Sequence, residues 1–452
     1  MSCTPLVLLV VCAYDLSGVL SPGQWRQLAQ KRPRNNEGIT HEEVAARYGS
    51  GDILEWHFDN GIPFEVTEEL VKAAAGNQES GRKILALLLD KRGAEIKITE
   101  GVVKAAAENY GSGKEILALL LDKRGAEIKI TEGVVEAAAR NSRSGKEILA
   151  LLLDKCGAEI KITEGVVKAA AENYGSGKEI LALLLDKRGA EIQITEEVVE
   201  AAAENYGSGK EILALLLDKR GAEIQITEGV VKAAAENYGS GKEILALLLD
   251  KRGGEIQITE EVVKAAAENY GSGKEILTLL LDKRGAEIKI TEGVVKAVVR
   301  SFDQTIFRQF LDKCGAEIQI TEGIVEAAAG NEESSRKILA LLLDKRGAEI
   351  QITEGVVKAA AENEESGEEV MALLLEKRGT EIQITEGVVK AAAGNNWSGK
   401  KILAMLLDKR GAEIQVTEGV IEAAAETGAS ERATPSRPLR TEYALPPPLA
   451  GS

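Results

Sequence analysis

Histidine is nearly absent from this chain of 452 residues, so only His41 and His57 are available to act as a general base or to bind zinc. Cysteine is scarce as well, and its four copies show neither CxxC spacing nor a disulfide framework. The cysteines are Cys3, Cys12, Cys156 and Cys314. These shortages argue against an enzyme, and we expect no catalytic residue, no metal site and no cofactor. The cysteine usage fits a reducing compartment, and we predict a cytoplasmic protein.

Long apolar runs and an excess of positive charge are also missing. No apolar stretch reaches the length of about 18 residues that a membrane-spanning helix requires. The 56 Lys and Arg are outnumbered by 72 Asp and Glu, which gives a net charge of −16. A surface that binds phosphate backbones needs a basic stripe, so we expect no nucleic-acid partner. The 44% hydrophobic content is too high for a wholly disordered chain.

The chain is rich in internal repetition, with a period of 32 residues. Each unit opens with a threonine, and the unit at Thr99 reads TEGVVKAAAENYGSGKEILALLLDKRGAEIKI. The unit-start threonines are Thr67, Thr99, Thr131, Thr163, Thr195, Thr227, Thr259, Thr291, Thr321, Thr353, Thr385 and Thr417. Every step is 32 residues except the step from Thr291 to Thr321, which is 30. A period of this size is typical of solenoids.

The repeats divide the chain into four regions. Eleven complete units and a half unit cover residues 67–426. A degenerate first unit is predicted over residues 40–66, where ILEWHFDNGIPFEVTEE aligns with ILALLLDKRGAEIKITE. Residues 1–39 are an N-terminal segment whose apolar run is either a short signal peptide or a cap on the first unit. Residues 427–452 are predicted to be a disordered, proline-rich tail.

Each unit predicts two helices. Thr99 is a candidate N-cap, and the alanine-rich run after it favours a first helix. The Tyr110-Gly111 pair ends this helix. Ser112 and Glu115 then form an S-x-x-E capping box, which predicts the start of a second, leucine-rich helix.

The second helix is predicted to end at Gly125, which follows two cations and has the sequence context of a C′ glycine. Ile128 and Ile130 alternate through an extended connector to the next unit. One such helix pair cannot bury its own apolar faces, whereas stacking buries them against both neighbours. The predicted fold is therefore an all-α solenoid of stacked helix-turn-helix units.

The AAAEN segment, the ILALLLDKRG helix and the GAEI exit resemble the ankyrin repeat, with its small-residue first helix and leucine-rich second helix. The resemblance covers residues 67–426, although the ankyrin opening Thr-Pro-Leu-His is replaced by Thr-Glu-Gly-Val. The full wording ITEGVVKAAAENYGSGKEILALLLDKRGAEI is similar to near-identical ankyrin-like arrays of filamentous fungi, which often follow a NACHT-type nucleotide-binding domain. The resemblance implies an array that binds a protein partner.

The tetrapeptide GSGK recurs between the two helices, for example at Gly111–Lys114. A Walker phosphate loop would also need a glycine five residues before the second glycine and a Ser or Thr after the lysine. Glu108 and Glu115 occupy those positions, so the start of a helix is favoured over a phosphate site.

Aromatic residues recur at the same turn, which varies more between copies than the rest of the unit does. These candidate partner-binding residues are Tyr110, Tyr174, Tyr206, Tyr238, Tyr270 and Trp397. One interpretation is a tolerant turn whose tyrosine packs over its neighbour. The alternative is an aromatic ladder that faces a partner, since Tyr and Trp are favoured in interfaces.

Two further features have structural and functional interpretations. Asp122–Arg124 and its copies are interpreted as a solvated charge ladder in which Cys156 and Cys314 replace the arginine of two units. The unit at Thr291 introduces three phenylalanines, which either refill a core left by two missing residues or form a bend or partner pocket. These are Phe302, Phe307 and Phe310.

We predict from these observations a non-catalytic scaffold that binds a protein partner. One alternative is the recognition array of a fungal nucleotide-dependent receptor, isolated or truncated. Another is a secreted structural or effector protein, for which Asn396-Trp397-Ser398 would be a glycosylation sequon. The partner and the oligomeric state are not specified by the sequence.

Overall fold

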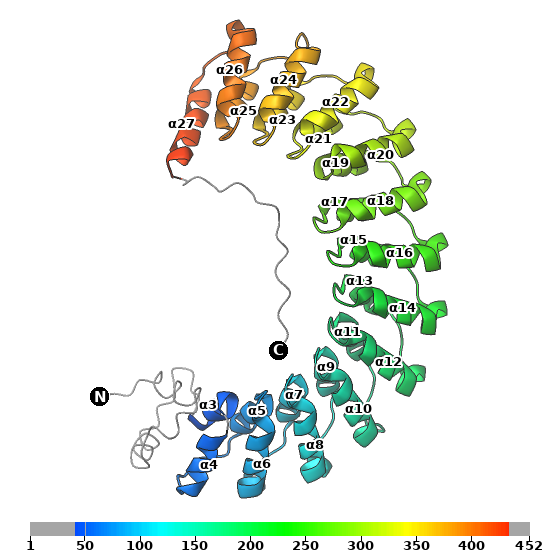
Figure 1. Ribbon diagram of the computed structural model, residues 1–452, viewed down its shortest axis with the longest axis vertical. Coiled ribbons are helices and arrows are strands. Elements are labelled where there is room, and N and C mark those ends of the chain that lie inside the picture. Colours follow the sequence, from blue (N-terminus) through cyan, green and yellow to red (C-terminus); the bar gives the residue numbers. More distant parts are fainter. Residues whose placement is uncertain (1–40, 50, 434–452) are drawn as a thin grey trace, which may run out of the picture. The chain divides into compact units, whose positions relative to one another are not determined.

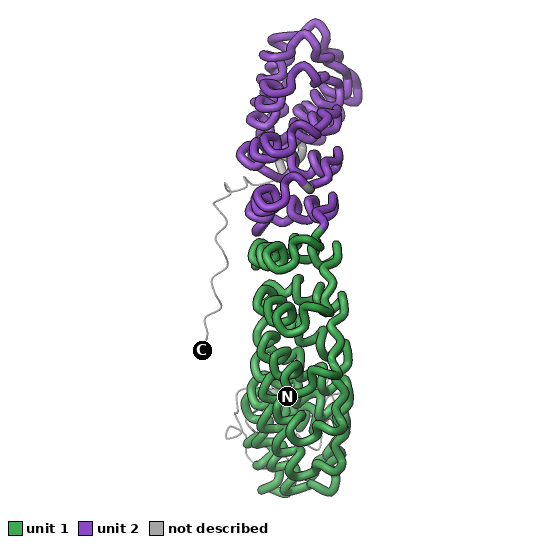
Figure 2. The backbone as a smooth tube through the Cα atoms, turned by 90° about the vertical axis from the view of Figure 1, so that its right-hand side faces the viewer, with its two compact units in different colours: residues 1–256 green, residues 257–452 purple. Residues whose placement is uncertain are grey.

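The computed structural model describes residues 41–49 and 51–433, which form helices joined by short connections. Within these residues there are 25 α-helices, labelled α3 to α27, and no β-strand. The chain divides into two compact units, Met1–Ile256 and Gln257–Ser452 (Figure 2). The all-α repeat solenoid predicted from the sequence is confirmed.

Odd-numbered helices are the short first helices of the repeats, here called A helices, and even-numbered helices are the second, B helices. Within each unit the A helices form one layer and the B helices another (Figure 1). The helices of the first unit are α3 (His41–Tyr48), α4 (Asp52–Asp59), α5 (Glu68–Gly76), α6 (Gly81–Arg92), α7 (Glu100–Glu108), α8 (Gly113–Arg124), α9 (Glu132–Arg140), α10 (Gly145–Cys156), α11 (Glu164–Glu172), α12 (Gly177–Arg188), α13 (Glu196–Glu204), α14 (Gly209–Arg220), α15 (Glu228–Glu236) and α16 (Gly241–Arg252). Those of the second unit are α17 (Glu260–Glu268), α18 (Gly273–Arg284), α19 (Glu292–Ser301), α20 (Gln304–Cys314), α21 (Glu322–Ala329), α22 (Ser335–Arg346), α23 (Glu354–Glu362), α24 (Gly367–Arg378), α25 (Glu386–Gly394), α26 (Gly399–Arg410) and α27 (Glu418–Ala433).

The core lies between the two layers and between successive repeats. In the repeat that starts at Thr99, α7 buries Val102 and Val103, and α8 buries Ile116 and Leu120. Helix α7 packs between α5 and α9, while α8 packs between α6 and α10. Each helix pair therefore shares its apolar faces with the pairs before and after it, so the packing is between nearest neighbours.

The shortened repeat at Thr291 places its phenylalanines in the core. Phe302, Phe307 and Phe310 are 6%, 0% and 0% exposed. This burial supports the interpretation that larger side chains refill the space left by the two missing residues. It gives no support to a partner pocket at these side chains.

The B helix starts where the sequence predicts, but the predicted capping box is wrong. Ser112 has φ −125° and ψ 18°, and its side chain makes no capping hydrogen bond to α8. A capping serine normally has extended backbone, which directs its oxygen to the first free N–H groups. Here the Oδ1 of Asn109 instead accepts hydrogen bonds from the backbone N–H groups of Gly111 and Ser112, both at 2.9 Å. The turn is therefore an asparagine turn of the kind in which the side chain replaces a backbone acceptor.

The predicted C′ role of Gly125 is also wrong. That role requires the left-handed conformation, whereas Gly125 has φ −53° and ψ −36°. It continues as a single 3₁₀ turn, Gly125–Glu127, before the extended backbone of Ile128. In the repeat that ends at Gly189 and Ile192, the carbonyl groups of the corresponding 3₁₀ turn are satisfied by the next repeat, as described below.

The ends of the array differ from the predicted boundaries. Helix α27 runs to Ala433, past the predicted start of the tail at residue 427. The rest of that tail and the predicted N-terminal segment, residues 1–39, lie outside the described residues. Helices α3 and α4 form a pair within the predicted degenerate unit. In the described part of the chain, each helix is too short or too polar to cross a membrane.

Candidate interaction surface

In most described repeats, a buried asparagine ties the interhelical turn to the preceding repeat. Asn205 is 5% exposed, and its Nδ2 donates a hydrogen bond to the carbonyl oxygen of Ala171 at 2.8 Å. Its Oδ1 accepts from the backbone N–H groups of Gly207 and Ser208 at 3.0 and 2.9 Å. The buried asparagines at this position are Asn77, Asn109, Asn141, Asn173, Asn205, Asn237, Asn269, Asn331, Asn363 and Asn395. Since both ends of the amide are held, the turn is a rigid platform.

In the repeats that carry Tyr174, Tyr206 and Tyr238, the glycine after the tyrosine lets successive turns approach each other. A Cβ atom on Gly207 would lie 2.7 Å from the carbonyl oxygen of Tyr174 and 3.0 Å from its Cβ. These distances leave no room for a larger residue, so the turns of adjacent repeats stack backbone against backbone.

The rigid turns expose the predicted tyrosines. Tyr174, Tyr206 and Tyr238 occupy consecutive repeats of the first unit and are 58%, 66% and 63% exposed. The rings of Tyr174 and Tyr206 are stacked, with centroids 6.1 Å apart and planes at 12°. We call these three residues the tyrosine row. Exposed aromatic rings held on a rigid backbone lose little conformational freedom when a partner binds.

The other three predicted aromatic residues are also exposed. Tyr110 is 41% exposed, and the repeat between it and Tyr174 has Ser142 at the corresponding position. Tyr270 and Trp397 belong to the second unit and are 95% and 65% exposed. All six residues of the predicted ladder are exposed, and the rings of Tyr174 and Tyr206 are stacked.

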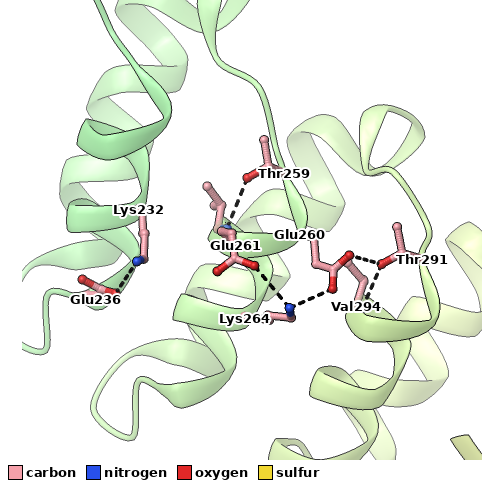
Figure 3. A network of polar contacts seen from close by, with 9 residues as sticks. Lys232, Glu236, Thr259, Glu260, Glu261, Lys264, Thr291 and Val294 are labelled. Atoms are coloured by element: carbon pink, nitrogen blue, oxygen red, sulfur yellow. Dashed lines mark hydrogen bonds and ion pairs between the residues drawn. The ribbon is translucent and has the colours of Figure 1, made fainter. Parts of the chain in front are cut away.

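A threonine–glutamate contact joins the start of most described A helices to the previous A helix, as Figure 3 shows for Thr291 and Glu260. Thr291 Oγ1 donates to Glu260 at 2.6 Å and accepts from the backbone N–H of Val294 at 3.2 Å. Lys264 Nζ lies 2.8 Å from the same carboxylate. The hydrogen bond from Lys264, with that from Thr291, holds the pKa of Glu260 below its ordinary value. At Thr291 the predicted N-cap role is thus combined with a contact between repeats, whereas Thr99 makes the contact to Glu68, at 2.7 Å, without a capping hydrogen bond of its side chain.

In most described repeats, the arginine at the end of the B helix caps carbonyl groups of the previous repeat, a role that sequence reasoning missed. Arg220 donates to the carbonyl oxygens of Gly189 and Ile192 at 2.8 and 3.2 Å. It also makes a bidentate pair with Glu223, at 2.7 and 2.5 Å. The interpretation of these residues as a solvated charge ladder holds only for the neighbouring exposed lysines, such as Lys219. The arginine is a cap supplied by the next repeat.

These contacts share one direction along the chain. In the asparagine, arginine and threonine contacts, the donor belongs to the later repeat and the acceptor to the earlier one. The exposed pair of Lys219 Nζ with Asp186 Oδ1, at 3.2 Å, has the same direction. In these four kinds of contact the earlier repeat supplies the acceptor and the later repeat the donor, whereas the exposed pair of Lys168 with Glu197, at 3.0 Å, has the opposite direction.

The two described cysteines stand where this arginine is missing, and both are free thiols. Burial raises the pKa of both Cys156 and Cys314 above the ordinary value. The Sγ of Cys314 lies 3.7 Å from the carbonyl oxygen of Gly285 and so only partly replaces the arginine cap. Burial thus disfavours the thiolate form of both side chains.

The GSGK glycine at the start of the B helix serves packing. A Cβ atom on Gly209 would lie 2.5 Å from the carbonyl oxygen of Ala202 and 3.1 Å from Cδ1 of Ile244. This close approach supports the helix-start interpretation of GSGK.

Among the described residues, no group of three or more His, Cys, Asp or Glu is placed to hold a metal ion. A shallow open depression of about 350 Å³ between two B-helix ends is lined by Lys219 and Arg220.

The family model described as a domain of unknown function, DUF7104, matches twelve segments between residues 61 and 430, which together make up more than half of the chain. The chain belongs to this family of helical repeats. The matched segments are 61–84, 87–116, 119–148, 151–180, 183–212, 215–244, 247–276, 279–301, 310–338, 341–371, 373–402 and 405–430. No curated protein matches the sequence. The predicted resemblance to ankyrin repeats and to NACHT-associated arrays is not confirmed by these comparisons.

Solved structures with a similar helical-repeat architecture include the pentatricopeptide repeat protein PPR10 from maize, at 14% identity and a TM-score of 0.34. The match covers 90% of this chain, which spans 61% of the PPR10 chain. A second structure, PPR10 in complex with an 18-nt psaJ RNA element, matches at 10% identity and a TM-score of 0.31, covering 94% of this chain and 72% of that one.

The prediction that nucleic acid is excluded as a partner is contradicted by the second of these structures, which holds RNA. That exclusion rested on the net charge of the whole chain. In helical-repeat proteins a few side chains per repeat can contact one base each, so the net charge does not decide the matter.

Proposed function

We propose that this protein is a non-catalytic scaffold that binds a protein partner through the tyrosine row. The observation that carries the proposal is the stacked pair Tyr174 and Tyr206, two large rings more than half exposed on turns that hydrogen bonds hold rigid. Tyrosine presents a large amphipathic surface at low entropic cost, which suits the centre of an interface. The free thiols of Cys156 and Cys314 support the further proposal of a cytoplasmic location.

The test compares three full-length proteins used as bait in cell extract. These are the natural sequence, a variant with Tyr174, Tyr206 and Tyr238 changed to alanine, and a matched control. The control changes Lys155, Lys187 and Lys219 to alanine. These lysines are about half exposed and sit at the far ends of the B helices, where their ion pairs contribute little.

A partner of the tyrosine row is enriched by the natural sequence and by the control, and lost with the tyrosine variant. Titration of the purified partner should then show binding at least about tenfold weaker for the tyrosine variant. Enrichment that disappears after ribonuclease treatment would identify RNA as the ligand and contradict the protein-binding proposal. Equal enrichment by all three baits would place the binding surface elsewhere.

The recognition array of a nucleotide-dependent receptor is a second proposal, drawn from the sequence resemblance. Purification of the full chain from cell extract tests this proposal. A nucleotide-binding protein that co-purifies and is released by nucleotide exchange would support it, and the absence of such a protein would contradict it.

A further inference from the structure

The A helices next to the tyrosine row carry an excess of negative charge. Helices α11, α13 and α15 pack side by side in the first unit (Figure 1), and each ends two residues before a tyrosine of the row. Together they have eight glutamates and two lysines, so their net charge is −6. The B helices that follow the turns begin with Gly-Lys-Glu and add no net charge there. The surface next to the row is therefore acidic.

Helix α13 is the most acidic of the three. Its Glu200 stands where α11 and α15 have lysine, so α13 has four glutamates and no cation of its own. Burial, followed by the charges of Glu196, Glu204 and Glu197, raises the pKa of Glu200. Lys168 of α11 pairs with Glu197 at 3.0 Å. The mutual repulsion of the other carboxylates shows that they lie close enough together to attract the same cationic partner.

An exposed carboxylate precedes each tyrosine of the row by two residues. These carboxylates are Glu172, Glu204 and Glu236. The stacked rings of Tyr174 and Tyr206 have their centroids 6.1 Å apart and their planes at 12°. A guanidinium group is attracted to the face of an aromatic ring within about 6 Å, and its N–H groups bind carboxylates in a bidentate manner. The ring faces and the carboxylates therefore favour the same side chain, arginine.

We propose that the tyrosine row, with the carboxylates of α11, α13 and α15, binds an extended, arginine-rich segment of a partner protein. The chemistry of this partner rests on the proposed function of the tyrosine row, to which the carboxylates add a preference for positive charge. In an extended segment every second side chain points to the same face, with a step of about 6.6 Å. This step is close to the 6.1 Å between the two ring centroids, so arginines at alternate positions can contact successive rings.

The test uses the full chain and a labelled synthetic peptide, RTRTRTR, with an amidated C-terminus. Fluorescence anisotropy at physiological ionic strength should show saturable binding to the natural chain. The matched peptide KTKTKTK should bind about fivefold more weakly, because an ammonium group cannot stack flat on a ring or form a bidentate pair with a carboxylate.

Two variants of the full chain separate the contribution of charge from that of the rings. Glu197→Gly combined with Glu200→Lys gives α13 the sequence EGVVKAAAE of α11 and α15, so this variant is expected to fold as those helices do. It should bind the arginine peptide about tenfold more weakly, although the tyrosines are unchanged. Changing Tyr174, Tyr206 and Tyr238 to alanine should also weaken binding about tenfold, although the carboxylates are unchanged.

The matched control changes Asp154, Asp186 and Asp218 to asparagine, which alters the net charge by the same three units as the double change in α13. These carboxylates are exposed and pair with lysines at the far ends of the B helices. The control should bind the arginine peptide as tightly as the natural chain does.

Absence of saturable binding by the natural chain, or equal binding of the arginine and lysine peptides, would overturn the proposal. Full binding by either the double variant of α13 or the tyrosine variant would overturn it too, as would an equal loss in the control. Capture of a protein through the tyrosine row by a chain that does not bind the arginine peptide would leave the proposed function in place and overturn only the assignment of an arginine-rich partner.

Discussion

Asn205 donates a hydrogen bond to the carbonyl oxygen of Ala171, 34 residues earlier, at 2.8 Å and in a buried position. This one contact joins the turn of one repeat to the A helix of the repeat before it. The same asparagine contact recurs along the array, and the exposed tyrosines lie on turns that this contact holds in place.

Asn205→Ala should reduce the free energy of unfolding by about 2–3 kcal/mol, because it leaves a buried carbonyl group and turn N–H groups without their partner. Urea denaturation followed by circular dichroism measures the loss. The matched control is Tyr206→Ala, which changes a side chain 66% exposed and should stay within about 0.5 kcal/mol of the natural protein. Equal losses in the two variants would show that the asparagine contact is not a major source of stability.

Two glycines of one repeat should respond in opposite ways to alanine. Gly209→Ala places a Cβ atom 2.5 Å from the carbonyl oxygen of Ala202 and should cost about 1–3 kcal/mol. Gly221 has right-handed helical backbone, and a Cβ atom added there would meet nothing within 4 Å, so Gly221→Ala should stabilise by about 0.5–1 kcal/mol. Thermal unfolding of the two variants decides this, and a destabilised Gly221→Ala would contradict the described helix end.

Cys156→Arg should stabilise the protein by about 0.5–1.5 kcal/mol. The new guanidinium would reach the carbonyl oxygens of Gly125 and Ile128, as Arg220 reaches those of Gly189 and Ile192. Arg220→Cys is the reverse change and should lose a similar amount. Chemical denaturation of both variants is the measurement. A neutral result for both would mean that the hydrogen bonds of the arginine cap are no more stable than those that the arginine and the carbonyl groups make with water.

Two glutamates should give pH dependence of opposite sign. The hydrogen bond from Arg220 lowers the pKa of Glu223, so its stabilisation is present at neutral pH and is lost as pH falls below about 4.3. Burial, followed by the nearby Glu196, Glu204 and Glu197, raises the pKa of Glu200, so its ionisation opposes folding at neutral pH.

Glu200→Gln should therefore raise the urea midpoint at pH 7, with the gain vanishing at pH 3.5, whereas Glu223→Gln should lower the midpoint at pH 7 only. Urea denaturation of both variants at the two pH values is the measurement. The same sign for the two variants at pH 7 would contradict this assignment.

Deleting one whole repeat, residues 163–194, should leave a folded protein of slightly lower stability, because the new junction joins faces that already match. Deleting residues 179–194 removes most of one B helix and its connector, and should destabilise the protein strongly. Equal and severe losses in both would show that folding depends on closure of the whole chain rather than on neighbouring contacts.

The repeat, both helices and the apolar core could be predicted from the sequence, because threonine spacing and leucine periodicity are local patterns. The contacts of Asn109 and Arg124 could not, because they join residues 28 to 34 positions apart. One signal was available for the asparagine. In the variable turns NQES, NYGS, NSRS, NEES and NNWS, the first residue never changes. A residue that stays constant where its neighbours vary has a partner, although the sequence does not say where.

The common direction of the asparagine, arginine and threonine contacts has a consequence for biosynthesis. A ribosome releases the earlier repeat first, and with it the acceptor groups, such as the carbonyl of Ala171. Each newly emerging repeat then brings its own donors to a surface that is already complete. The nascent chain can therefore fold one helix pair at a time, and no folded repeat depends on a segment far along the chain.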